Sequence, residues 1–146
     1  MAEIDKGLIF GEALAVTSGT TVAPTSIPLS TARNIFQGKQ LVVAILVTVA
    51  AHSSSGDETY QWDVLSDTTG AIGAPTVEIS RAIGRAVLLA GSLWTIPVPL
   101  EMTQQTFLGL RAVLAGTGPT ITYSAYLAPA DDVVQWVAPA DALTIR

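Results

Sequence analysis

The sequence of 146 residues predicts an all-β fold, a sandwich or barrel of eight or nine short strands. Segments with alternating or β-branched apolar residues recur along the chain, and Gly, Pro, Ser and Asp separate them. Helical periodicity is scarce, and no internal repeat divides the chain. A single domain of this length can bury a core without disulfides, and the chain has no cysteine.

The clearest strand signal covers residues 107–128, FLGLRAVLAGTGPTITYSAYLA. Alternate positions on either side of a Gly-Thr-Gly-Pro turn are apolar, namely Leu108, Leu110, Ala112, Leu114, Ile121, Tyr123, Ala125 and Leu127. This period of two predicts two half-buried strands. The strands either pair directly, with Leu114 opposite Ile121, or lie in opposite sheets, as consecutive strands of double-sheet folds often do.

Three other segments define the expected architecture. Residues 41–51 form a nearly continuous apolar run, which predicts a central strand covered on both faces. Residues 92–100 contain Pro97 and Pro99, which place this strand at a sheet edge or a bend. Residues 81–91 have apolar spacings of three to four and are expected to form at most one short helix. Further strands are expected within residues 8–16, 22–29, 59–65, 76–80 and 133–137.

The composition favours a soluble protein that packs against other proteins. Charged residues make up 13% of the chain, about half the usual share of roughly 25%, whereas hydrophobic residues make up 49%. No window supplies about 20 continuous apolar residues, so we expect no membrane span. The first residues, MAEIDKGLIF, have no signal-peptide pattern. The net charge of −5, without a basic cluster, argues against nucleic acid as the main partner.

Residues for chemistry are few, and we expect no enzymatic activity, no metal and no cofactor. Without cysteine there is no thiol nucleophile, and the only histidine, His52, stands beside a serine run without a G-x-S-x-G elbow elsewhere. No phosphate-binding loop of the G-x-x-x-x-G-K type is present. Oxygen ligands suit Ca²⁺, but the clustered acids lack calcium-loop spacing and are expected to be solvated; they are Asp57, Glu58, Asp63 and Asp67.

The aromatic residues and the first apolar segment are candidates for contacts. Trp62 alternates with core positions and is expected to be buried, whereas Trp94 falls on the face opposite the prolines. Trp136 is either an interface anchor, since aromatic residues are enriched at interfaces, or a cap on the protein's own core. The segment that includes Leu8–Phe10 is either an ordinary first strand or an arm that reaches a neighbouring subunit.

Several segments, in this order and spacing, resemble the small jelly-roll capsid cement proteins, also called decoration proteins, of tailed phages. They are Leu8-Ile9-Phe10-Gly11-Glu12-Ala13, Gly38 with the strand from Leu41, Ser66-Asp67 after the 60–65 strand, Gly91 to Pro97-Val98-Pro99, Phe107-Leu108-Gly109-Leu110 leading to Gly116-Thr117-Gly118-Pro119-Thr120, and Tyr126-Leu127. The resemblance covers residues 8–128, and the segment after Pro129 is longer than the family pattern.

The resemblance implies an antiparallel β-sandwich of jelly-roll type, with one domain over residues 1–146, an N-terminal arm (1–10) and a C-terminal tail (129–146). It implies a homotrimer on the outer capsid surface of a virion, made in the host cytoplasm, which binds between major capsid protein subunits. There it would hold the shell against internal DNA pressure. Expected capsid or inter-subunit contacts are Leu8, Ile9, Phe10, Trp94 and Trp136.

Two other functions remain open at this point. A carbohydrate-binding jelly roll, or a phage tail, fibre or baseplate component, predicts that Trp94 or Trp136 is exposed among polar neighbours. A jelly-roll enzyme of the cupin type needs several metal-binding histidines, and the chain has one.

Overall fold

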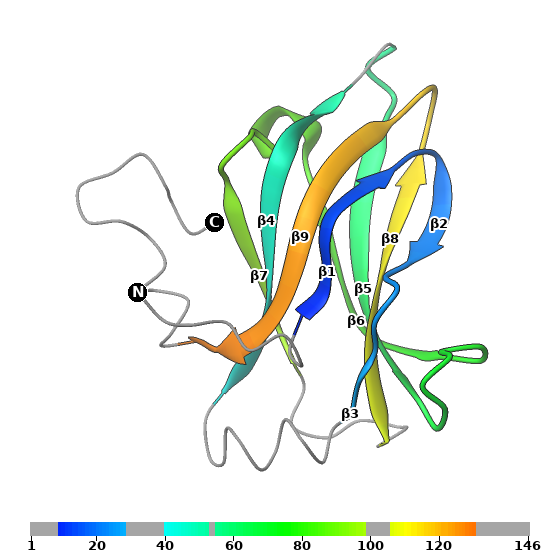
Figure 1. Ribbon diagram of the computed structural model, residues 1–146. Coiled ribbons are helices and arrows are strands. Elements are labelled where there is room, and N and C mark those ends of the chain that lie inside the picture. Colours follow the sequence, from blue (N-terminus) through cyan, green and yellow to red (C-terminus); the bar gives the residue numbers. More distant parts are fainter. Residues whose placement is uncertain (1–8, 29–39, 53–54, 99–105, 131–146) are drawn as a thin grey trace.

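The computed structural model describes residues 9–28, 40–52, 55–98 and 106–130, which form two antiparallel sheets packed face to face (Figure 1). Sheet A consists, in spatial order, of β1 (Ile9–Val16), β9 (Thr120–Pro129), β4 (Leu41–His52) and β7 (Leu93–Pro97). Sheet B consists of β2 (Gly19–Val22), β8 (Phe107–Ala115), β5 (Thr59–Asp67) and β6 (Thr76–Ile83), and β3 (Ile27–Pro28) also pairs with β8.

The strand pairs are nested along the chain, and this nesting is the jelly-roll topology. The innermost pair is β5 with β6, the next is β4 with β7, then β2 and β3 with β8, and the outermost is β1 with β9. Together β2 and β3 take the place of one strand, so the nine strands of the described residues fill eight positions. The prediction of an all-β jelly-roll sandwich is therefore confirmed.

The connection between β8 and β9 crosses from one sheet to the other. Direct pairing of these strands, with Leu114 opposite Ile121, was one of two expectations and is wrong, because Leu114 pairs with Gly19 and Ile121 with Val16. The alternation itself is confirmed, since all eight of its apolar side chains are buried. Side-chain periodicity shows which face of a strand is buried but not which strand it pairs with. Direct pairing and placement in opposite sheets would bury the same face of β8 and of β9.

The strands at the centre and edge of sheet A lie as predicted. β4 lies between β9 and β7, and its Val43, Ile45 and Val47 point into the main core. β7 is an edge strand of sheet A. Pro97 has no N–H to donate, and at an edge this costs the sheet no hydrogen bond.

The expectation of at most one short helix within residues 81–91 is confirmed. β6 continues to Ile83 and is followed by a single 3₁₀ turn, η2 (Arg85–Val87). Leu88 is fully buried, and its carbonyl oxygen accepts a hydrogen bond from Ala51 N at 3.0 Å. The loop after η2 is therefore held by its contact with the end of β4, not by further helical hydrogen bonds.

The loop between β5 and β6 packs on sheet B where Ile72 lies against Gly109 of β8. Ile72 is buried although it has a φ of 51°, a conformation that costs a side-chain-bearing residue about 1–2 kcal/mol. A Cβ atom on Gly109 would lie 3.2 Å from the Ile72 side chain, so the missing side chain provides room for the loop. Burial of Ile72 thus offsets a strained backbone.

We predict that Gly116→Ala lowers the free energy of unfolding by about 2–4 kcal/mol. Gly116 has a φ of 100°, and a Cβ atom there would lie 2.7 Å from the backbone at Asp57 and Glu58. Gly84→Ala is the matched control, because a Cβ atom on Gly84 meets nothing within 4 Å. Urea denaturation measures both, and equal stability of the two variants would contradict the prediction.

Candidate functional site

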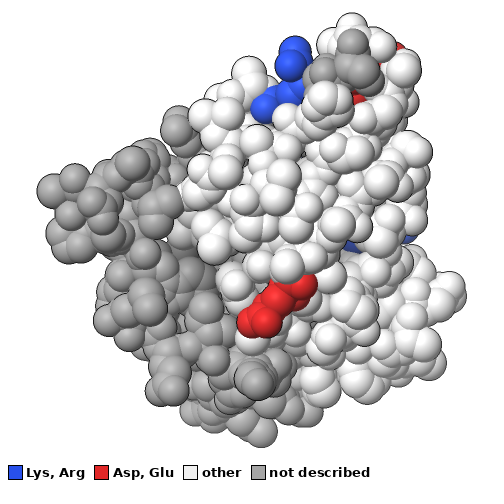
Figure 2. All heavy atoms as spheres, turned by 45° about the horizontal axis from the view of Figure 1, so that its top comes forward, with Lys and Arg blue, Asp and Glu red and all other residues white. Residues whose placement is uncertain are grey.

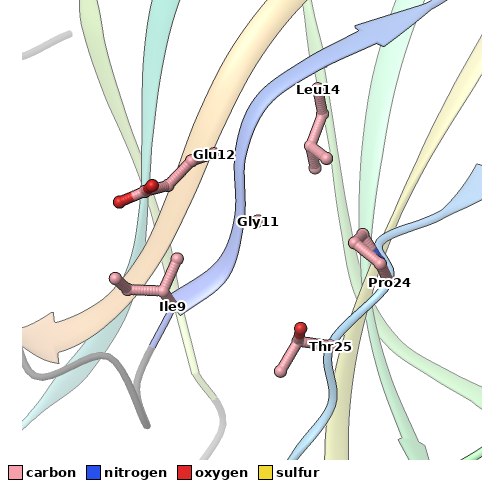
Figure 3. Close-up of a pocket in the computed structure, with 6 residues that line it drawn as sticks. All are labelled: Ile9, Gly11, Glu12, Leu14, Pro24 and Thr25. Atoms are coloured by element: carbon pink, nitrogen blue, oxygen red, sulfur yellow. The ribbon is translucent and has the colours of Figure 1, made fainter.

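A hollow lies beside β1, between the edges of the two sheets (Figure 3). Thr25 N donates a hydrogen bond to Phe10 O at 3.2 Å, and Ala23 N donates to Leu110 O at 2.8 Å. These bonds tie the β2–β3 connection to both sheets and leave the space next to β1 open. The hollow has a volume of about 360 Å³ and is lined by Ile9, Gly11, Glu12, Leu14, Pro24 and Thr25.

An irregular strand gives the hollow its shape. The pairing of β1 with β9 shifts register on both sides of Gly11, and Ala13 has a φ of 49°. Ser124 Oγ accepts a hydrogen bond from Ala13 N at 2.9 Å, which holds this conformation. The Leu14 side chain lies only 2.5 Å from where a Cβ atom on Gly11 would be. A side chain at position 11 would therefore clash with Leu14 unless Leu14 moved.

The lining of the hollow is mostly uncharged. Figure 3 shows Ile9 and Glu12 projecting on one side of β1, with Leu14, Pro24 and Thr25 on the other. Acid–base or nucleophilic chemistry needs at least two converging functional groups, and the hollow has one carboxylate. The hollow therefore presents apolar side chains around a single charge.

Sheet A is nearly uncharged. Glu12 is the only Asp, Glu, Lys or Arg in its four strands. Figure 2 shows a mostly uncharged face of the molecule, with one compact group of acidic atoms near its centre and a basic group and a few further acidic atoms at its top. Removing a charged side chain from water is costly, so a face with few charges can be buried by a partner at low cost.

The clustered acids of the sequence do not form a metal site. Within the described part of the chain, no three His, Cys, Asp or Glu residues are grouped to hold a metal ion. Asp57 accepts hydrogen bonds from Thr117 N at 3.0 Å and Thr117 Oγ1 at 3.1 Å, which joins two loops. Glu58 accepts from the backbone N–H groups of Ser55 and Gly56. These carboxylates stabilise turns.

Asp63 is buried in a polar network across three strands of sheet B. Its carboxylate accepts hydrogen bonds from Arg111 Nε at 2.7 Å, Ser80 Oγ at 2.7 Å and Gln61 Nε2 at 2.8 Å. Burial raises the pKa of the carboxyl, but the bonds from Ser80, Arg111 and Gln61 outweigh it, and the pKa lies below its usual value. The expectation of a solvated carboxylate is wrong for Asp63.

Asp67 organises the β5–β6 loop. Its carboxylate accepts hydrogen bonds from the backbone N–H groups of Ala74, Thr68 and Thr69. The bond from Ala74 is the largest cause that lowers the pKa of Asp67, and desolvation opposes it. Like Asp63, Asp67 and Glu58 are buried, contrary to expectation.

The five expected contact residues have different positions. Leu8 and Trp136 lie outside the described residues, and Ile9 lines the hollow. Phe10 is 0% exposed and belongs to the main core, so its side chain is not available to a partner. Trp94 is 6% exposed, with the Arg81 guanidinium carbon 5.2 Å from its ring centroid and its Nε1 donating to Ser92. Both aromatic residues serve the chain's own packing.

Only part of the hollow was predictable. A glycine inside an apolar strand pattern often marks a bulge, and β1 is bulged around Gly11. Pro24 and Thr25 gave no signal of a role, because their place beside β1 depends on how the β2–β3 connection crosses between the sheets. Burial of Trp62, in contrast, is confirmed.

We predict that Asp63 makes stability fall at acidic pH. Because its folded pKa is depressed, its contribution is present above the unfolded pKa of about 4 and is lost as the pH falls through the folded value. The wild-type free energy of unfolding should therefore drop between about pH 5 and pH 2, and less steeply in Asp63→Asn. In Ser80→Ala, which removes one hydrogen-bond donor to Asp63, the pH slope of the free energy of unfolding should lie between those of the wild type and Asp63→Asn. An unchanged slope in Asp63→Asn, measured by urea denaturation across this range, would refute the assignment.

The comparisons with known proteins give no family. No protein-family model matches the chain, and no curated protein matches its sequence. In the described residues, no helix has the length and apolar composition needed to cross a membrane.

Proposed function

We propose that this protein is a capsid decoration protein: a structural virion component that binds the outer capsid surface between major capsid protein subunits, as a homotrimer, and stabilises the shell. The proposal originates in the resemblance of residues 8–128 to that class. The single observation that supports it best is the uncharged surface of sheet A, with one carboxylate beside an apolar hollow at its β1 margin. No enzymatic activity, nucleic acid or membrane is part of the proposal.

The physical argument concerns how a small domain can strengthen a large shell. An uncharged surface binds through apolar contact, at about 25 cal/mol per Å² of buried apolar area, without desolvating many charges. Contacts that are weak singly become strong when a trimer makes several at once. The compact sandwich supplies a rigid body to carry such contacts.

The alternative of a carbohydrate-binding module loses one of its two predicted features. It required Trp94 or Trp136 to be exposed with polar neighbours, and Trp94 is buried beneath Arg81. Trp136 lies outside the described residues. No observation in the structure favours this alternative or a tail, fibre or baseplate component over capsid decoration.

We predict that purified particles of the source virus contain this chain at about one copy per major capsid protein subunit, or a simple fraction of that number. Quantitative gel densitometry or mass spectrometry of intact particles measures the ratio. A handful of copies per particle would assign the chain to a tail or vertex. Absence from particles would refute the proposal.

We further predict that Ile9→Asp weakens capsid attachment at least tenfold without unfolding the protein, because a half-buried apolar residue of the hollow gains a charge that must be desolvated on binding. Val77→Asp is the matched control, since Val77 is 42% exposed on β6, in the other sheet. Binding to particles stripped of the protein measures both.

Equal attachment by the Ile9 and Val77 variants would exclude the β1 margin as a contact. The arm is tested separately by deleting residues 1–8, because a deletion that reaches Phe10 removes a core side chain and confuses attachment with folding. Unchanged attachment and oligomer size after this deletion would show that the arm is not used.

A further inference from the structure

Two charged side chains of the described residues, one of each sign, have no ion-pair or hydrogen-bond partner there. Of the three described arginines, Arg81 and Arg111 donate hydrogen bonds within the fold, whereas the exposed Arg85 does not. Among the described acids, only the exposed Glu12 accepts no hydrogen bond. The others all accept one and are Asp57, Glu58, Asp63, Asp67 and Glu78. One cation and one carboxylate are therefore available to a partner.

Arg85 lies in a loop that exposes apolar side chains. The loop follows β6 at one end of the sandwich and is hydrogen-bonded along β4, from Gly91 N to Val47 O at 2.7 Å (Figure 1). Of the five large hydrophobic side chains that are exposed in the described residues, three lie on this loop and the adjoining end of β4. They are Val49, Val87 and Leu89, with exposed fractions of 59%, 38% and 55%. Arg85 and these three residues form the η2 patch.

The hollow beside β1 is complementary to the η2 patch in shape and charge. It has a volume of about 360 Å³, and Glu12 stands among apolar lining residues. A cavity of about 150 Å³ holds a benzene molecule, so the hollow has room for the Leu89 side chain. One chain cannot bring the two features together, because β1 and β7 are opposite edges of sheet A and the η2 loop leads into β7.

We propose that the η2 patch of one copy docks in the β1 hollow of a second copy, with Leu89 in the hollow and Arg85 paired with Glu12. The contact joins two different surfaces, and such head-to-tail contacts form a closed ring when the rotation between copies permits. A ring of three is the homotrimer. This inference rests on the homotrimer of the proposed function and assigns the hollow to a neighbouring copy, so the uncharged surface of sheet A is left for the shell.

The apolar side chains and the charges have different effects in this contact. Burial of Val87 and Leu89 removes apolar surface from water and supplies most of the affinity. An exposed ion pair adds little affinity, but like charges at the same place oppose docking, so Arg85 and Glu12 fix which surfaces meet. Since both charges stand on exposed side chains without partners in the described fold, reversing them should leave folding intact.

The first test reverses the charges in the full chain and measures self-association by sedimentation equilibrium. We expect a trimer for the wild type, and about tenfold or greater weakening in Glu12→Arg and in Arg85→Glu. The chain with both substitutions should recover the trimer, because the pair is present again with its charges exchanged. Leu89→Ser should also weaken the trimer, whereas Val77→Ser, which alters an exposed apolar residue of sheet B, should not.

The second test determines the geometry of the contact by cross-linking, for which the absence of native cysteine is an advantage. A chain that carries both Glu12→Cys and Arg85→Cys is treated with a short bis-maleimide and separated on a denaturing gel. A closed ring gives a covalent trimer as the largest product, and chains with only one of the cysteines remain unlinked. A covalent dimer as the largest product, or a ladder of longer products, would overturn the proposal.

The outcomes separate this inference from the proposed function. A monomeric wild type, or a trimer that the single charge reversals leave intact, would overturn the head-to-tail contact. If the chain is nevertheless present on particles at the expected copy number, capsid decoration stands without it. Absence of the chain from particles, together with an intact trimer that the charge reversals dissociate, would refute capsid decoration and leave the contact between copies in place.

Discussion

The structure depends on a core shared by two sheets, and the contact at its centre joins Trp62 of β5 to Tyr123 of β9. Their rings meet edge to face, with centroids 5.5 Å apart and planes at 85°, and both side chains are fully buried. Such aromatic pairs contribute about 0.5–1.5 kcal/mol beyond the area they bury. Burial raises the pKa of Tyr123 to about 12, so its phenol stays neutral within the core. The flanking strands place their alternate apolar residues around this pair.

The sequence revealed those features that depend on one strand alone. Alternation identified the inward faces of β8 and β9, the apolar run identified β4 as central, and the prolines placed β7 at an edge. What it did not reveal depends on contacts between distant segments. The positive φ of Ile72 follows from the space above Gly109, and the burial of Phe10 follows from the first strand being part of sheet A. Neither has a local signal, because the partner residue lies far away in the chain.

All four edges of the sandwich carry features that oppose pairing with another strand. In sheet A, β7 contains Pro97, and β1 is bulged around Gly11. In sheet B, the β2–β3 edge is interrupted by Pro24, and β6 is bulged and turns Arg81 inward, where its guanidinium donates to Thr95 O. Bulges, prolines and inward charges are the usual protection of edge strands. Assembly through the described residues is therefore expected to use faces rather than added strands.

The placement of charged residues also favours assembly through the faces of the sheets. Asp57, Glu58 and Asp67 hold loops, and Asp63 pairs with Arg111 inside sheet B, so these four described carboxylates stabilise the fold. Each of these carboxylates is already hydrogen-bonded within the fold. A chain with 13% charged residues, used in this way, leaves broad uncharged faces. An isolated protein with such faces risks aggregation unless the most apolar area is covered. Burial of such faces against partner molecules would remove this risk, so the placement of charges and the protected edges both favour assembly through faces.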